Sequence, residues 1–188
     1  MNKKLVVGVV GALVVLGAGT VYLITSRGSS TTPSTTNTSQ TVQVVPVTAN
    51  PIHNTSTQPG LSISNAMVEN NTDPATGNAV ADRLQFSIKN SSSQTMTNLE
   101  VYYTMTDATT NKSESYYQKL TGISLAPGQS TYVFFDNGSG VGHYPENKYS
   151  IYRTSTNAVN FTIEVSAPGF QPATAQAHKS PGAGDAKD

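Results

Sequence analysis

The 188-residue chain carries no net charge at pH 7, because its 11 lysines and arginines balance its 11 aspartates and glutamates. Beyond the N-terminus the basic residues form no cluster, so the sequence offers no electrostatic surface for nucleic acid. Cysteine is absent, which excludes disulfides and attachment through a lipidated cysteine. Charged residues make up 12% of the chain, about half the usual share, which is typical of a neutral secreted surface.

The first element along the chain is an apolar run over residues 5–25, LVVGVVGALVVLGAGTVYLIT. As a helix this run would be roughly 31 Å long, which matches the hydrocarbon core of a bilayer. A cleaved signal peptide is the alternative, with a cut site at residues 17–19. Because the apolar residues 21–24 continue beyond that site, we expect a retained transmembrane signal anchor, with the lipid bilayer as its partner.

The charges on either side of this run predict its orientation. Lys3 and Lys4, in the short start 1–4, outweigh Arg27 on the far side. The positive-inside rule then places the N-terminus in the cytoplasm. We therefore predict a single-pass protein of the cell membrane, with the rest of the chain extracytoplasmic.

The next segment, residues 26–60, is rich in Ser, Thr, Asn and Pro and shows no sustained helix or strand period. Such a segment cannot bury enough apolar surface to offset the entropy that ordering would cost. We therefore predict a disordered tether, which as a random coil would span about 30 to 35 Å.

From residue 61 the apolar pattern changes to a period of two, which predicts β-strands. Leu84, Phe86 and Ile88, for example, fall on one face of their segment. Short strands at even spacing favour an all-β fold, an antiparallel β-sandwich over residues 61–179. Pro172 predicts that the last strand lies at an edge. The tail 180–188 is predicted to be disordered. The expected strands are 62–69, 84–90, 99–107, 115–123, 130–136, 149–153, 160–167 and 174–179.

The segment LQFSIKNSSSQTMTNLEVYYTMTD, followed by ISLAPGQSTYVFF, resembles immunoglobulin-like modules of the CARDB and related kinds in bacterial extracytoplasmic proteins. The shared elements are a strand ending in Lys89-Asn90, a Ser-rich turn, a strand of valine and aromatics, and a Pro-Gly turn. Residues 135–153 also resemble a segment of small membrane-anchored Gram-positive proteins of unknown function, with a similar Gly-His-aromatic-Pro-x-Asn-Lys-Tyr run. The resemblance implies an immunoglobulin-like fold outside the cytoplasm, and it supplies no catalytic or binding residues.

Residues that could support catalysis or metal binding are few. Ser139, His143 and Asp136 could form a hydrolase triad, but they share one Gly-rich loop and lack the G-x-S-x-G elbow. Asp136, Asn137, Ser139 and Glu146 offer oxygen ligands for calcium without the spacing of an EF-hand. Phosphate-loop, dinucleotide and HExxH motifs are absent from the sequence. We expect no catalytic residue, no metal site and no cofactor.

The most distinctive soluble segment is the loop around residues 142–145. Long loops on a rigid scaffold often carry function, and exposed Tyr can stack on sugar rings or anchor a protein interface. Plain packing in the core is the alternative, because Tyr is a common strand residue. The candidate ligand-binding residues are His143, Tyr144, Tyr149 and Tyr152.

Two Tyr-Tyr pairs, at residues 102–103 and 116–117, add further aromatic side chains. Because strand residues alternate between faces, we expect one member of each pair in the core.

The sequence as a whole predicts a non-catalytic cell-envelope protein that presents an extracytoplasmic immunoglobulin-like binding or structural module. Its partner would be a protein or a cell-wall polymer. A carbohydrate- or wall-binding module is the first alternative, and a small hydrolase is the second.

Overall fold

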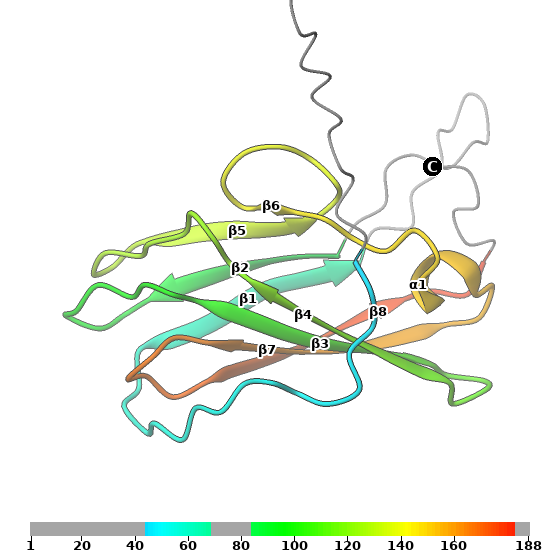
Figure 1. Cartoon of the computed structure of the whole chain (residues 1–188), viewed down its shortest axis with the longest axis horizontal. Coiled ribbons are helices and arrows are strands. Elements are labelled where there is room, and N and C mark those ends of the chain that lie inside the picture. Colours follow the sequence, from blue (N-terminus) through cyan, green and yellow to red (C-terminus); the bar gives the residue numbers. More distant parts are fainter. Residues whose placement is uncertain (1–43, 69–83, 183–188) are drawn as a thin grey trace, which may run out of the picture. The chain divides into compact units, whose positions relative to one another are not determined.

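The computed structural model describes residues 44–68 and 84–182 (Figure 1), all within one compact unit, Gln40–Asp188. These residues form two four-stranded sheets packed face to face, which confirms the predicted all-β sandwich. The predicted membrane anchor at residues 5–25 lies outside the described residues. Within the described residues, no helix is long and apolar enough to cross a membrane.

Each sheet takes strands from distant parts of the sequence. The first sheet has the order β1-β2-β5-β6 and the second the order β4-β3-β7-β8. Neighbouring strands pair antiparallel, except that β6 runs parallel to β5. β8, which follows Pro172, lies at an edge as predicted. The strands are β1 (Leu61–Val68), β2 (Leu84–Asn90), β3 (Glu100–Asp107), β4 (Ser113–Lys119), β5 (Ser130–Phe135), β6 (His143–Tyr144), β7 (Val159–Ser166) and β8 (Ala173–Lys179).

The core lies between the two sheets and follows the predicted alternation. Leu84, Phe86 and Ile88 of β2 are buried, while Lys89 is exposed. On the second sheet every second residue of β3 and β7 faces the first sheet. The buried side chains of these two strands include Val101, Tyr103, Met105, Phe161, Ile163 and Val165.

The strand predicted at residues 149–153 is wrong, because the chain forms the short helix α1 (Ile151–Thr154) there. The Ser150 carbonyl accepts hydrogen bonds from the backbone N–H groups of Arg153 and Thr154, both at 3.0 Å. Three consecutive residues, Ile151 to Arg153, are buried. A strand would place alternate residues on opposite faces, whereas these backbone hydrogen bonds close one helical turn in which all three residues are buried.

The predicted tether is described only from residue 44, and residues 44–60 lie against the domain. We call these residues the strap. The Val47 N–H donates to the Ser115 carbonyl at 2.8 Å, and the Asn50 amide donates to Glu164 at 2.9 Å. Ile52 is buried. In Figure 1 the strap, in cyan, runs beneath the second sheet and then enters β1.

Asn54 attaches the far end of the strap. Its side-chain amide donates to the Ser166 hydroxyl at 2.9 Å and to the carbonyls of Ala167 and Phe170 at 3.0 and 2.8 Å. The Gln171 N–H then donates to the Gln58 carbonyl at 2.7 Å. Residues 44–60 of the predicted tether therefore belong to the folded unit, because polar side chains and backbone hydrogen bonds add to the apolar contacts of Val44 and Ile52.

Candidate functional site

Three rings form a row on the outer face of the first sheet. Val133 and Phe135 of β5 point into the core, so alternation places Tyr132 and Phe134 on the opposite, outer face. The Tyr132 and Phe134 rings lie 5.7 Å apart and within 12° of parallel. The His143 ring follows at 5.1 Å from Phe134 and at 25° to it. We call Tyr132, Phe134 and His143 the ring row.

Glycine at position 142 allows the loop after β5 to return alongside that strand. The Phe134 N–H donates to the Gly142 carbonyl at 2.8 Å, and Phe134 then pairs with His143. A Cβ at position 142 would lie 2.8 Å from the Tyr132 carbonyl oxygen, and the φ of +93° there disfavours other residues. The close approach that sets His143 beside Phe134 therefore requires glycine.

A hydrogen bond to Asp136 fixes the orientation of the His143 ring. The Asp136 carboxylate oxygens lie 2.9 and 3.1 Å from Nδ1 of His143. Because a carboxylate can only accept, this contact places a ring proton on Nδ1. A Cβ at Gly138 would lie only 2.7 Å from Nδ1, so a second glycine makes room for the pair.

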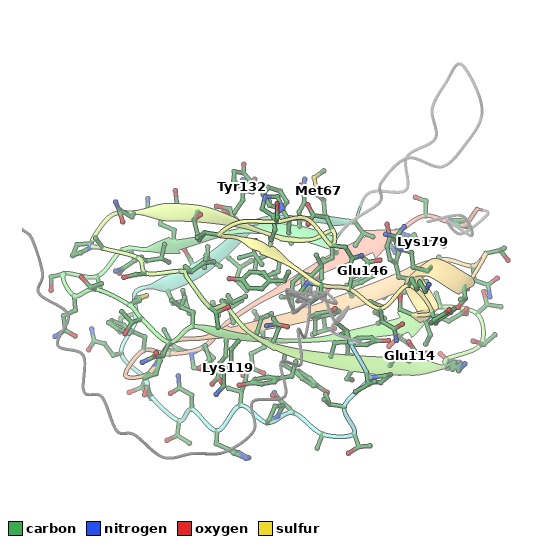
Figure 2. All side chains as sticks on the ribbon, turned by 45° about the horizontal axis from the view of Figure 1, so that its top comes forward. Met67, Glu114, Lys119, Tyr132, Glu146 and Lys179 are labelled. Atoms are coloured by element: carbon green, nitrogen blue, oxygen red, sulfur yellow. The ribbon has the colours of Figure 1, made fainter. Side chains whose placement is uncertain are left out.

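A β-bulge in β1 brings a side chain of that strand into the same outer surface. The register of β1 against β2 shifts between Ser64 and Met67, where Asn65 adopts a left-handed φ of 51°. Bulges of this kind re-aim the side chains that follow them. As a result Met67 pairs with Gln85, which pairs with Phe134. Met67 and Tyr132 are each 47% exposed, and Figure 2 shows both on the same face of the domain.

The four predicted ligand-binding residues do not come together. Tyr144 is buried, and its hydroxyl donates to the Thr121 carbonyl at 3.0 Å. Burial raises the pKa of Tyr144 to about 12. Tyr152 is also buried, with its ring edge-on to Phe161 at 5.9 Å. Both side chains are therefore part of the core and present no surface to a ligand.

Of the other two predicted residues, only His143 belongs to the ring row. Tyr149 is 67% exposed in the loop before α1, and the Lys148 ammonium lies 5.1 Å from its ring centre. The Tyr-Tyr pairs follow the predicted alternation. Tyr103 and Tyr116 stack in the core at 5.5 Å.

The outer members of the Tyr-Tyr pairs lie on the second sheet. The Tyr117 hydroxyl donates to Glu100 at 2.7 Å. Burial first, and then the hydrogen bond to Glu100 and the charge of its carboxylate, raise the pKa of Tyr117 to about 12. Both Tyr117 and Tyr102 are half-buried.

The predicted triad and calcium ligands are brought together only in part. Asp136 contacts His143, but Ser139 forms no hydrogen bond to His143 in the described part of the chain. The Glu146 carboxylate forms an ion pair with the Arg153 guanidinium, and both side chains are about 5% exposed or less. Within residues 44–68 and 84–182, no three His, Asp or Glu side chains cluster as a metal site would require.

Tyr132, Phe134 and Met67 were not among the sequence candidates. The signal for the first two was present in β5, where placing Val133 and Phe135 in the core leaves Tyr132 and Phe134 outside. Met67 had no such signal, because its direction depends on the bulge at Asn65.

Comparison with known proteins gives no family for this chain. No family model matches it, and no curated protein matches it. Among solved structures it is similar to the alkylpurine DNA glycosylase AlkC of Pseudomonas fluorescens, bound to DNA containing an abasic site analogue. That likeness has 17% identity and a TM-score of 0.35, and it covers 64% of this chain and 30% of the glycosylase chain. At such a TM-score it carries no argument about function.

Proposed function

We propose that this protein is a non-catalytic, membrane-anchored binding module of the cell envelope. The apolar run at residues 5–25 supports an anchor, and Lys3 and Lys4 support a cytoplasmic N-terminus. Under this proposal the sandwich lies outside the cell membrane, where it meets its partner.

The proposal includes an immunoglobulin-like type of sandwich. Strand connections pass between the two sheets after β2, after β4 and after β6, as the Greek-key connections of immunoglobulin-like sandwiches do. The absence of cysteine in the sequence means that such a domain would rely on its apolar core instead of a disulfide. This arrangement supports the resemblance to bacterial extracytoplasmic modules.

The observation that carries the binding function is the ring row. Tyr132 exposes nearly half of its surface beside Phe134 and His143, although burial would stabilise these rings. Exposed aromatic side chains on a rigid sheet are typical of binding surfaces. The row is also held in place by the hydrogen bond between Asp136 and His143 and by the β5–β6 pairing, so binding would not have to order it.

The test is retention of the full-length protein, in detergent micelles, by the insoluble cell-envelope fraction of its own cells. We expect wild type to be retained and the Tyr132→Ala, His143→Ala double variant to be lost. Tyr149→Ala is the matched control, because Tyr149 is more exposed than Tyr132 but lies outside the row. Equal retention of all three proteins would contradict a binding role for the ring row.

A small hydrolase is the second candidate, and the contact between Asp136 and His143 is the observation that favours it. A carboxylate that orients a histidine in this way recurs in hydrolytic sites, where the histidine activates a nucleophile. Ser139 is the hydroxyl in the same loop. If any hydrolysis is found, Ser139→Ala and His143→Ala should each abolish it, and unchanged rates would remove this candidate.

A further inference from the structure

We infer that the ring row binds a linear chain of uncharged sugar units that lies across the outer face of the first sheet. This inference rests on the proposed binding function and names the class of its partner. It follows from the rings, from the polar groups beside them and from the charge of the face.

The rings supply the apolar part of the contact. A pyranose ring has an apolar face of C–H bonds that stacks on an aromatic ring, and Tyr combines such a ring with a polar tip. Tyr132 offers the largest exposed ring surface of the row. Phe134 and His143 follow at 5.7 and 5.1 Å centre to centre, and because these rings stack on one another, the sugar stacks on Tyr132 and the next unit meets the edges of the other two rings.

Polar side chains flank the rings on the side of β1 and β2. Gln85 pairs with Phe134, and Ser64 lies opposite Ser87, which pairs with Tyr132. The Gln85 amide, whose nitrogen also contacts the Met67 sulfur, and the Ser64 hydroxyl can donate and accept hydrogen bonds. Sugar hydroxyls need partners that both donate and accept hydrogen bonds. A purely apolar ligand would instead leave these polar groups of the protein without hydrogen bonds.

The length of the surface around the ring row favours a polymer over a single sugar. The line of side chains Met67, Gln85, Phe134 and His143 crosses four strands, and because strands lie about 4.8 Å apart it extends for roughly 14 Å, with Tyr132 beside it on β5. That distance exceeds one sugar ring. A chain laid across the strands would contact Met67 at one side and His143 at the other.

The charge of the face favours a neutral ligand. Of the Lys, Arg, Asp and Glu residues in the described chain, strand pairing places Lys89 and Asp136 near this face, and Asp136 is already paired with His143. Stacked rings also bind single-stranded nucleic acid, but that mode needs a positively charged groove along the backbone. A single lysine does not provide one.

The test is calorimetric titration of the full-length protein, in a detergent without a sugar headgroup, with hexamers of β-1,4-linked N-acetylglucosamine and of β-1,4-linked glucose. We expect at least one hexamer to bind wild type and Tyr149→Ala equally. Tyr132→Ala should weaken binding about tenfold, as the loss of one central aromatic contact does. Tyr132→Phe should retain binding, because it keeps the ring.

Three outcomes would overturn the inference. Binding that is undiminished in Tyr132→Ala would place the sugar elsewhere. If neither hexamer binds, while retention by the envelope fraction still depends on the ring row after its polysaccharide is removed, the partner is a protein and only the sugar inference fails. If no retention depends on the ring row, the proposed function fails as well.

Discussion

The two outer faces of the sandwich differ in what lies over them. The strap, residues 44–60, runs along the second sheet and bonds to Ser115, Glu164 and Ser166. The first sheet has no such cover among the described residues, and it carries the ring row instead. The contrast in exposure rests on Tyr132, which is 47% exposed, whereas Phe134 and His143 are half-buried like the outer tyrosines of the second sheet, Tyr102 and Tyr117.

The two faces are also built by different means. The strap is attached through side-chain amides, of which Asn54 alone forms three hydrogen bonds. The ring row depends on backbone geometry, because the bulge at Asn65 and the close approach at Gly142 determine which side chains meet. Substitutions should therefore be able to disturb one face and leave the other intact.

The largest loss of stability should come from breaking the buried ion pair between Glu146 and Arg153. Glu146→Ala removes the carboxylate that pairs with the buried Arg153 guanidinium, at a cost of about 3 to 5 kcal/mol in the free energy of unfolding. Urea unfolding measures this loss. The control is Glu146→Ala combined with Arg153→Met, which should recover most of the stability, and a double variant as unstable as the single one would contradict the assignment.

The second-largest loss of stability should come from Gly142→Ala, which should disturb the face that carries the ring row and leave the strap face intact. Gly142→Ala combines a strained φ with a clash against the Tyr132 carbonyl, for a loss of roughly 3 kcal/mol. Gly140→Ala is the matched control, because its φ of +102° is equally strained but no atom lies within 4 Å of the added Cβ. Thermal melting should show the larger loss for Gly142→Ala, and equal losses would mean that the close approach is unimportant.

Asn54→Ala should disturb the strap face. It removes three hydrogen bonds and leaves the carbonyls of Ala167 and Phe170 without that donor, at a cost of about 2 kcal/mol. Thr55→Ala, at the exposed neighbouring residue, should cost little. Hydrogen exchange should increase across residues 44–57 in Asn54→Ala while β5 stays protected, and faster exchange in both would show that the faces are coupled.

Near neutral pH the stability of both faces should be unchanged, and below pH 4 the whole domain should lose stability. Hydrogen bonds from Ser155, from the Thr110 N–H and from Asn157 hold the pKa of the Asp107 carboxyl well below its ordinary value of 3.8. A lowered pKa contributes stability above the ordinary value, and this contribution is lost as the pH falls through the folded value. The stability difference between wild type and Asp107→Asn should therefore shrink in urea titrations from pH 7 to pH 2.5, and a constant difference would refute this role.

Tyr132→Ala should have the smallest effect on stability, about 1 kcal/mol or less, because the side chain is nearly half exposed. Tyr149→Ala should behave similarly in thermal melting. The two variants should then differ in binding alone, which isolates the function of the ring row from its contribution to folding. A large loss of stability in Tyr132→Ala only would indicate a structural role for its ring.

Most strands could be predicted from the sequence, because alternation along the chain directly reports which face a strand buries. The predicted strand 84–90 matches β2, and Pro172 correctly indicated an edge. The segment around α1 could not be predicted in this way. Tyr149, Ile151 and Arg153 alternate like a strand, but their positions depend on contacts with residues far away in the sequence.

The candidate site could be predicted only in part, for a similar reason. His143 stood out because its loop is rich in glycine, and the structure places it in the ring row. Tyr144 and Tyr152 stood out equally but are buried. Tyr144 lay in a predicted loop, where no period reports burial, and Tyr152 lay in the strand wrongly predicted at residues 149–153. The strap was missed because its apolar residues, Val44, Val45, Val47 and Ile52, show no sustained period, and the pattern of Asn50 and Asn54 gains meaning only beside β7.

The strap has a mechanical consequence if the chain is pulled from its N-terminal side. Its contacts are spread along the second sheet from Val47 to Asn54, so tension at residue 44 would break them in sequence rather than all at once. Complete release of residues 44–60 would add roughly 50 to 60 Å of extended chain while both sheets stayed folded. The chain would thus lengthen before either sheet unfolds, and the arrangement of the ring row on the first sheet would stay intact under tension.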